Sequence, residues 1–267
     1  MKKKVLLTIA GYDPTSGAGT VLDINVFQHL GFTGMGIITS LTAQNTQQVS
    51  KVYCPPPNLI MDQYKSLGDD IKLSGIKVGM LGCKKNISPL AKILSLNSSI
   101  PRVIDPVFQS SSGTWLLEPE AIPNYMKAIA GQITILTPNA QEAALITGFQ
   151  VKTLNEMERA AKNIHELCEA PCLITGGHFE KETADLLFDG KKSFVFKHNK
   201  IDVAVHGTGC FLSSALLSYL CQGEGIKKAC QLAINKTYSN ITRSVRIGQG
   251  QNLFSLPHPN ESKTSAE

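Results

Sequence analysis

The sequence lacks several short motifs that identify large enzyme classes. GxxxxGK(S/T) does not occur, because Ser16 stands where the motif would need its second glycine after Gly11. Neither Gly17-Ala18-Gly19 nor Gly207-Thr208-Gly209 is followed by the third glycine of GxGxxG, and HExxH, GxSxG and an EF-hand loop are also absent. These absences disfavour a Walker-type nucleotide hydrolase and a common dinucleotide-binding enzyme.

Arginine is scarce, and positive charge is spread thinly along the chain. Only four arginines occur, and 26 basic against 21 acidic residues leave a net charge of +5 over 267 residues. Proteins that bind nucleic acids usually concentrate their cations on one face, whereas the lysines here are scattered. We therefore expect no nucleic-acid partner.

Cysteine pairs with metal-binding spacing are missing as well. The seven cysteines include no CxxC pair, and the closest two, Cys168 and Cys172, have no second pair near them. An odd set of thiols, several of them inside apolar helical patterns, is typical of small buried hydrophobic residues. We expect a cytoplasmic protein with no metal held by sulfur.

No apolar run is long enough to cross a membrane. Lys2-Lys3-Lys4 before Val5 to Ala10 imitates the start of a signal peptide, but this run ends after six residues. The uncharged segment from Leu30 to Ser50 is rich in polar residues and glycine, and the one from Phe211 to Cys221 is about half a bilayer span. We expect a buried first strand and no membrane partner.

Short β-branched runs alternate with longer helical patterns. This alternation predicts right-handed βαβ units and a largely parallel sheet with helices on both faces, which is the α/β class. No internal repeat or linker divides the chain. The predicted strands are Val5 to Ala10, Gly36 to Leu41, Ile76 to Met80, Val103 to Asp105, Ile133 to Leu136 and Leu173 to Thr175.

The last third of the chain predicts a hairpin and two helices. Asp189-Gly190 inside the run from Ala184 to Lys197 indicates an antiparallel hairpin. Apolar residues at helical spacing predict a helix that ends near Gly223 and a second one from Ile226 to Ile241. Residues 255–267 have two prolines and no periodicity, so we expect them to be disordered.

Polar and glycine-rich residues follow the predicted strands. Ligands of open parallel sheets bind where the carboxyl ends of the strands meet. A turn would explain any one of these clusters. A site is predicted because all of them lie at the same edge of the predicted sheet. The clusters are Gly11 to Gly19, Thr42 to Thr46, Leu81-Gly82, Asp105-Pro106, Thr137 to Asn139 with Glu142, and Gly176 to His178.

The strongest local candidate is the segment from His206 to Cys210, which leads into a helix predicted to start near Phe211. Unpaired N–H groups and the helix dipole attract anions at a helix start, and two glycines let the backbone approach a phosphate. The alternative is a glycine-rich turn before a buried helix. We favour the anion site.

Four polar residues each have two interpretations. Asn139 and Glu142 fit a capping box, but they also suit the water shell of a magnesium ion that bridges phosphates. Asp105 before Pro106 is a second such carboxylate or a common turn. Gln44 could pair with one edge of a heterocycle or satisfy a loop backbone.

Six segments in order resemble the hydroxymethylpyrimidine and phosphomethylpyrimidine kinases of thiamine biosynthesis, members of the ribokinase-like superfamily. The resemblance runs from about residue 5 to 245. The matching segments are Gly11-Tyr12-Asp13-Pro14 with Ser16 to Gly19 and Asp23, Leu41 to Thr46, Val78 to Gly82, Ile104 to Val107, Leu136 to Asn139 with Glu142, and His206 to Cys210.

The resemblance implies a ribokinase-like three-layer α/β/α sandwich and one domain over residues 1–254. It also implies a homodimer that uses ATP and magnesium. The implied activity is phosphorylation of 4-amino-5-hydroxymethyl-2-methylpyrimidine to its monophosphate and then to the diphosphate. Two alternatives stay open: a pyridoxal or pyridoxine kinase, and a non-catalytic regulator that binds ligands with the same fold.

The resemblance also assigns the site residues. Gly11, Ala18, Asp23, Gln44, Met80 and Val107 would line the pyrimidine pocket, with Gln44 on the aminopyrimidine edge. Asp105, Asn139, Glu142, Thr175 and Gly177 would serve the nucleotide and phosphates, with Asp105 and Glu142 toward magnesium through water. Gly207, Thr208 and Gly209 would form an anion hole with Cys210, which stands where many superfamily members have an aspartate base.

Some positions depart from the family pattern. Thr175 stands where lysine commonly precedes Gly-Gly-His, so one cation on the nucleotide phosphates is missing, and Lys84 or Lys181 are candidates to replace it. Tyr12, Phe211 and the segment from Ser110 to Thr114 also differ. A thiol at a helix N-terminus is expected to be more acidic than a free thiol, and this applies to Cys210.

Overall fold

One mixed β-sheet runs through the computed structural model, which describes residues 3–178 and 182–256. Its strand order is β3-β2-β1-β4-β5-β6-β7-β8-β9. Neighbouring strands from β2 to β7 are parallel, and β3, β8 and β9 are antiparallel additions at the edges. The strands are β1 (Val5–Tyr12), β2 (Thr33–Gln44), β3 (Val49–Tyr53), β4 (Leu73–Val78), β5 (Arg102–Ile104), β6 (Ile135–Leu136), β7 (Cys172–His178), β8 (Glu182–Phe188) and β9 (Ser193–Asn199).

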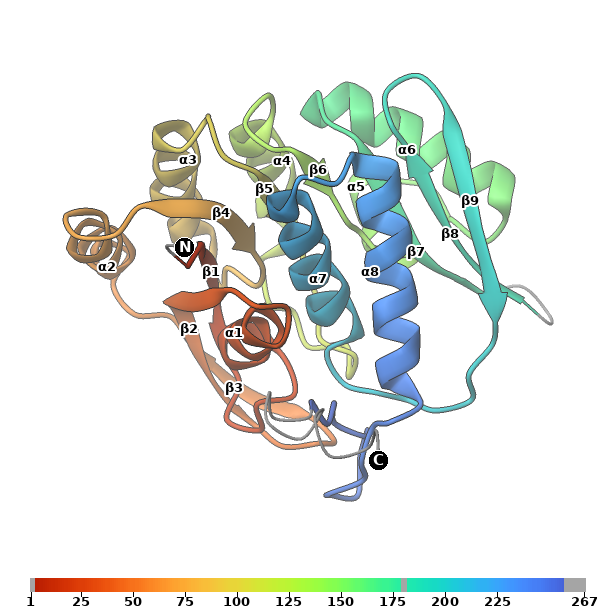
Figure 1. Ribbon diagram of the computed structural model, residues 1–267, viewed down its shortest axis with the longest axis horizontal. Coiled ribbons are helices and arrows are strands. Elements are labelled where there is room, and N and C mark those ends of the chain that lie inside the picture. The colour runs from red at the N-terminus through yellow and green to blue at the C-terminus, as the bar shows by residue number, and fades with distance from the viewer. Residues whose placement is uncertain (1–2, 179–181, 257–267) are drawn as a thin grey trace.

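Helices cover both faces of this sheet. Helices α1, α7 and α8 pack on one face and α2 to α6 on the other (Figure 1). The expected α/β class and three-layer sandwich are thus confirmed. The helices are α1 (Gly19–His29), α2 (Asn58–Gly68), α3 (Ile87–Leu96), α4 (Ile122–Ile129), α5 (Ala140–Thr147), α6 (Leu154–Cys168), α7 (Thr208–Gln222) and α8 (Ile226–Ile241).

Consecutive apolar residues in the inner strands explain the two cores. Successive side chains of a strand point to opposite faces. Leu6 and Val103 therefore join the core under α1, α7 and α8, while Leu7 and Ile104 join the core under α2 to α6. All four are fully buried, and truncating such a residue to alanine typically costs about 2 to 5 kcal/mol.

The predicted elements occur with some different bounds. Strand β2 is longer than predicted and pairs with β3, which the sequence did not predict because its side chains are exposed or half-buried and show no apolar alternation. Strand β4 ends at Val78 rather than Met80. The β8–β9 hairpin and α8 are confirmed. Helix α7 begins three residues before Phe211, at Thr208.

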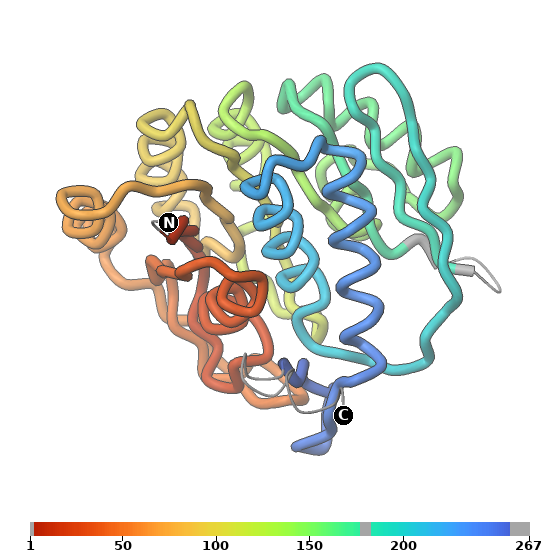
Figure 2. Tube along the Cα trace, viewed as in Figure 1, coloured from red at the N-terminus to blue at the C-terminus, as the bar shows by residue number. Residues whose placement is uncertain are grey.

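The end of the described chain packs beside the hairpin of β2 and β3 (Figure 2). Gln251 donates its N–H to the Thr46 carbonyl at 3.0 Å, and Gly250 donates to the Thr46 hydroxyl at 3.2 Å. Gln251 thereby lies at the edge of the sheet where the strands end and lines a cavity there. Residues 257–267, most of the segment expected to be disordered, lie outside the described residues.

Candidate active site

A cavity of about 250 Å³ opens at the carboxyl ends of the parallel strands. Most of the residues assigned to the site by sequence line this cavity. Gly177 pairs with Ala184 between β7 and β8, and Asp23 is buried behind the wall. The predicted residues on the wall are Gly11, Ala18, Gln44, Met80, Asp105, Val107, Asn139, Glu142, Thr175, Gly207, Thr208, Gly209 and Cys210.

Two helix N-termini meet at one end of the cavity. Gly207 is the N-cap of α7 with a φ of +79°, and a Cβ there would collide with the Gly17 carbonyl, so only glycine fits. The N–H groups of the first turn of α7, from Thr208 to Cys210, have no partners inside the helix. Gly19, the first residue of α1, donates its N–H to the Cys210 thiol. The partial positive charges of both helix starts therefore favour an anion here.

The Cys210 thiol lies between these helix starts and the cavity. It is half-buried, and desolvation raises its pKa to about 12, against the lowering effect of the Lys77 charge. The negative charges of Asp105 and Asp23 add to the increase. The expectation of an acidic thiol is therefore wrong, because burial and two carboxylates outweigh the helix dipole.

Lys77 is a fully buried lysine in β4, behind the wall of the cavity. Its Nζ lies 2.8 Å from Asp23 Oδ2 and 3.9 Å from Asp105 Oδ2. Burial by itself lowers the pKa of the ammonium, but the charges of Asp23, Cys210 and Asp105 outweigh burial and raise it. Lys77 is therefore charged and holds two carboxylates together beneath the site.

Asp23 does not line the pocket, so this prediction is wrong. Its carboxylate is 0 % exposed and accepts hydrogen bonds from Thr8 Oγ1 at 2.6 Å and Ser214 Oγ at 2.8 Å, besides the ion pair with Lys77. These three partners occupy both oxygens. Asp23 is part of the support of the site, because a buried carboxylate needs such partners.

Asp105 and Glu142 place two buried carboxylates on the cavity wall. Burial raises the pKa of both groups, and the charge of Asp105 raises that of Glu142 further. Glu142 also forms a capping box: it accepts the Asn139 N–H at 2.8 Å, and its own N–H donates to Asn139 Oδ1 at 2.9 Å. The capping interpretation is confirmed, and the same carboxylate still faces the cavity.

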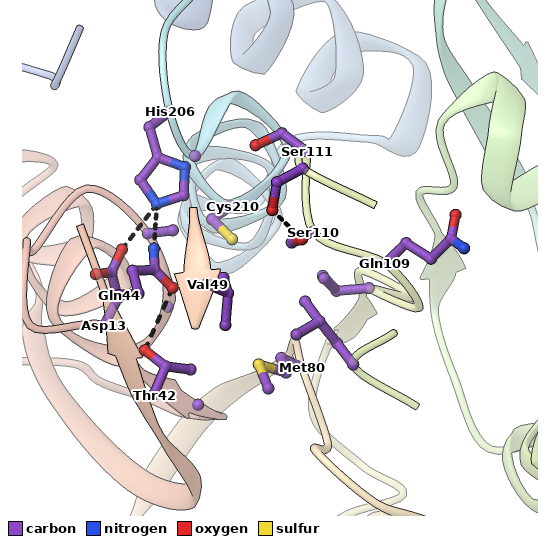
Figure 3. A pocket seen from close by; sticks show the side chains of 18 of the residues that line it. Asp13, Thr42, Gln44, Val49, Met80, Gln109, Ser110, Ser111, His206 and Cys210 are labelled. Carbon is purple, nitrogen blue, oxygen red and sulfur yellow. Dashed lines mark hydrogen bonds and ion pairs between the residues drawn. The ribbon is translucent and has the colours of Figure 1, made fainter. Parts of the chain in front are cut away.

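A cluster of polar side chains lies on one side of the cavity, beside the start of α7 (Figure 3). His206 Nε2 lies 2.8 Å from Asp13 Oδ2 and 2.8 Å from the Gln44 amide, whose other end lies 3.2 Å from Thr42 Oγ1. Uncharged side chains, from Asn45 to Gln48 and from Gln109 to Ser112, also line the cavity. Apart from Asp13, which is paired with His206, these side chains suit a neutral, polar ligand.

Within residues 3–178 and 182–256, neither lysine nor arginine lines the cavity. Thr175 lies on its wall, beside Asn139 through an isolated parallel bridge. Lys84 starts a short helical turn, where its N–H donates to Glu118 Oε2 at 2.7 Å, and does not line the cavity. Lys181 lies outside the described residues. Backbone N–H groups are therefore the main anion-binding groups on this wall.

Sequence reasoning missed three residues of the site. Lys77 could have been noticed as a lysine inside an otherwise apolar strand, Ile76-Lys77-Val78. Asp13 and His206 occur in the matching segments but received no role. Their contact joins positions 193 residues apart, which no local pattern reveals.

No helix among the described residues has the length and apolar character needed to span a membrane.

Comparisons with known proteins agree with the architecture. A sequence model of the phosphomethylpyrimidine kinase family matches residues 13–255. A hydroxymethylpyrimidine/phosphomethylpyrimidine kinase of Aquifex aeolicus is 35 % identical over 94 % of this chain and 99 % of its own.

Two solved structures are similar across their length. A phosphomethylpyrimidine kinase from Clostridium difficile 630 is 34 % identical with a TM-score of 0.78, covering 90 % of this chain and 100 % of its own. An ADP complex of pyridoxal kinase from Bacillus subtilis is 28 % identical with a TM-score of 0.85, covering 96 % and 98 %. The chain belongs to the phosphomethylpyrimidine kinase family, with the ribokinase-like fold.

Proposed function

We propose that this kinase transfers the terminal phosphoryl group of ATP to 4-amino-5-hydroxymethyl-2-methylpyrimidine, and then phosphorylates the resulting monophosphate to the diphosphate. Membership of the phosphomethylpyrimidine kinase family supports this activity. The observation that carries it is that one cavity holds both a polar wall around Gln44, with Asp13 paired to His206, and an anion site at the start of α7. The first suits the heterocycle and the second the phosphates.

Cys210 lies where the acceptor and the anion site would meet. With a pKa of about 12, only about one thiol in 100,000 is ionised at pH 7. A thiolate formed in advance is therefore not the means of activating the acceptor alcohol. The alcohol proton would leave late, as expected for a loose phosphoryl-transfer transition state in which positioning and charge stabilisation dominate. The second step attacks with a phosphate oxygen and needs no base.

Asp105 and Glu142 would hold the magnesium ion, in part through water. Two neighbouring buried carboxylates with raised pKa values are stabilised by a divalent cation, and Mg²⁺ commonly binds through one or two carboxylates, waters and substrate phosphates. Among the described residues, no group of three or more His, Cys, Asp or Glu side chains gathers for a metal, so the nucleotide phosphates would supply the remaining ligands. The bound ion would neutralise charge on the transferring phosphoryl group.

Pyridoxal is the alternative acceptor, favoured by the TM-score of 0.85 with a pyridoxal kinase. An assay of ATP consumption separates the two functions, with the pyrimidine alcohol, its monophosphate and pyridoxal at matched concentrations. We expect turnover of both pyrimidines, with product diphosphate identified by chromatography. Turnover of pyridoxal alone would overturn the proposal in favour of the alternative, and no turnover of any acceptor would favour a non-catalytic protein.

We further propose a cytoplasmic homodimer in which residues 1–254 form one domain. Free cysteines throughout the described residues suit a reducing compartment, and segments from Gly11 to Gln251 contribute to the same cavity. Light scattering during size-exclusion chromatography tests the dimer, since a monomer would elute with the mass of one 28.9 kDa chain. A single cooperative unfolding transition is expected for one domain.

A further inference from the structure

The Asp13 carboxylate fixes the position of a proton on His206. Asp13 Oδ1 accepts two hydrogen bonds from Thr15, from its N–H at 2.8 Å and from its hydroxyl at 2.8 Å. Asp13 Oδ2 lies 2.8 Å from His206 Nε2. A carboxylate can only accept, so this ring nitrogen carries a proton, whether the imidazole is neutral or charged.

That proton determines which end of the Gln44 amide faces the ring. The structure draws the Gln44 amide with its nitrogen 2.8 Å from the same His206 Nε2 and its oxygen toward Thr42 (Figure 3), but a ring nitrogen that carries a proton cannot accept from an amide NH₂. The two ends of a carboxamide have nearly the same shape, so hydrogen-bonding chemistry decides between them. Hydrogen-bonding chemistry therefore favours the amide turned over, with the Gln44 oxygen toward His206 and the His206 N–H shared between that oxygen and Asp13.

The far end of the amide leads to the same orientation independently. The Thr42 hydroxyl has one proton and lies 3.0 Å from the Tyr12 carbonyl, which can only accept. Thr42 therefore donates to Tyr12 and accepts at its own oxygen, 3.2 Å from the Gln44 amide. A donor is therefore favoured beside Thr42, which is the NH₂ group once the amide is turned over from the drawn orientation.

The imidazole ring has little room to move. Its Cδ2 lies 2.6 Å from where a Cβ on Gly17 would stand, and the backbone N–H of His206 donates to the Asn252 carbonyl at 2.9 Å. Any side chain at residue 17 would displace the ring. The ring is thus held from both sides, and so is the amide that it contacts.

An amide fixed in this way distinguishes two kinds of heterocycle. One N–H and one lone pair of Gln44 are used by Thr42 and His206, which leaves one donor and one acceptor for a ligand. An aminopyrimidine edge, with an exocyclic N–H and a ring nitrogen, complements that pair. An oxopyrimidine edge presents the reverse order, which would require the amide to turn over.

We propose that Asp13 acts through His206 to fix the orientation of Gln44, and that this relay selects a 4-aminopyrimidine over its 4-oxo counterpart. Asp13 and His206 are positioning residues in this scheme, and Gln44 contacts the ligand. The selectivity rests on the proposed function, whereas the relay itself does not.

The relay is tested without substrate by ¹⁵N NMR of the histidine side chains. We expect Nε2 of His206 to carry its proton in the wild-type protein, and the Asp13→Asn variant to populate the other tautomer. The His206 signal is assigned by its loss in His206→Asn. A wild-type His206 with an unprotonated Nε2 would overturn the relay, whatever the enzyme phosphorylates.

The selectivity is tested by the ratio of kcat/KM for the 4-amino alcohol to that for its 4-oxo counterpart. Loss of a well-formed two-point contact typically changes discrimination by about tenfold or more, so we expect this ratio to fall about tenfold in Asp13→Asn, His206→Asn and Thr42→Val. His165→Asn is the matched control, because His165 lies on α6 and bonds the Ala170 carbonyl away from the cavity.

An unchanged ratio in all three variants, despite lower activity, would overturn the inference and leave only a structural role. A wild-type enzyme that acts on neither pyrimidine would refute the proposed function and the selectivity, while the NMR result still decides the relay.

Discussion

Lys77 Nζ and Asp23 Oδ2 lie 2.8 Å apart with neither side chain exposed to solvent. Removing one partner of a buried pair leaves an uncompensated charge, which typically costs about 3 to 5 kcal/mol. We expect Lys77→Met to lower the free energy of unfolding by that amount in urea. Adding Asp23→Asn to Lys77→Met should recover part of the loss, because the orphaned charge is removed.

Lys162→Met provides the control for this pair. Lys162 lies 2.8 Å from Glu158 on the surface, with both side chains more than two-fifths exposed, and such pairs contribute about 0 to 1 kcal/mol. If Lys77→Met were no more destabilising than Lys162→Met, the buried pair would not be a support of the site.

The cluster around Lys77 illustrates what the sequence could predict and what it could not. Val5 to Ala10 was predicted from a continuous apolar run, and Ile226 to Ile241 from apolar residues at helical spacing, because burial leaves such patterns in neighbouring residues. Lys77 and Asp23 are 54 residues apart, and their contact depends on how β4 and α1 are packed.

For the site too, local patterns could be predicted from the sequence, whereas effects of the fold could not. The anion site at the start of α7 was predictable, because its glycines let the backbone approach a phosphate. The pKa of Cys210 is raised first by burial and then by carboxylates that the fold brings near, so the local rule for a helix N-terminus gave the wrong direction. Strand β3 was missed because an exposed edge strand has no apolar alternation to detect.

The raised pKa of Asp185 predicts that the stability of the protein depends on pH. Its carboxylate is buried in β8, accepts the Gly176 N–H at 2.9 Å and lies 3.4 Å from His198 Nε2. Burial raises its pKa to about 7, above the value of about 3.9 in an unfolded chain. The folded state therefore binds this proton more tightly between about pH 4 and pH 7, and the stability it contributes is present below pH 4 and lost as the pH rises through 7.

We expect the wild type to lose unfolding free energy relative to Asp185→Asn as the pH rises from 4 to 7. The slope is about 1.4 kcal/mol per pH unit at most. Burial lowers the pKa of His198, so His198 titrates with the opposite sign, and His198→Gln should keep the Asp185 slope. A difference that does not vary with pH between 4 and 7 would mean that Asp185 is ionised throughout.

Cys210→Ala is expected to weaken the first phosphorylation much more than the second. The first acceptor is a neutral alcohol that the thiol would position for attack, and a misplaced reactant can cost about 10²-fold in rate, whereas the second acceptor is already an anion that the anion site itself can position. Single-turnover rates measured with the alcohol and with its monophosphate compare the two steps. Equal losses in both steps would indicate that Cys210 acts on phosphate binding or on structure.

Gly209→Ala should instead slow both steps. Gly209 is exposed to the cavity, and its new Cβ would lie 3.6 Å from Asp105 Oδ2, an ordinary contact that the fold tolerates but that fills phosphate-binding space. Gly225→Ala is the matched control, since Gly225 precedes α8 with open space around it. Unchanged rates in Gly209→Ala would remove the start of α7 from the mechanism.

Thr175→Lys is expected to improve the use of ATP. Asp13, Asp105 and Glu142 put negative charge on the cavity wall, while no lysine or arginine from the described part of the chain lines it. A lysine at residue 175, beside Asn139, would add a charge-assisted contact to the nucleotide phosphates, and such contacts are about twice as strong as neutral ones. We expect KM for ATP to fall several-fold in steady-state assays, and the gain to shrink as salt screens the new charge. Thr175→Gln adds length without charge and should leave KM near the wild-type value; if it lowered KM as much as Thr175→Lys does, side-chain length and not the missing cation would limit nucleotide binding.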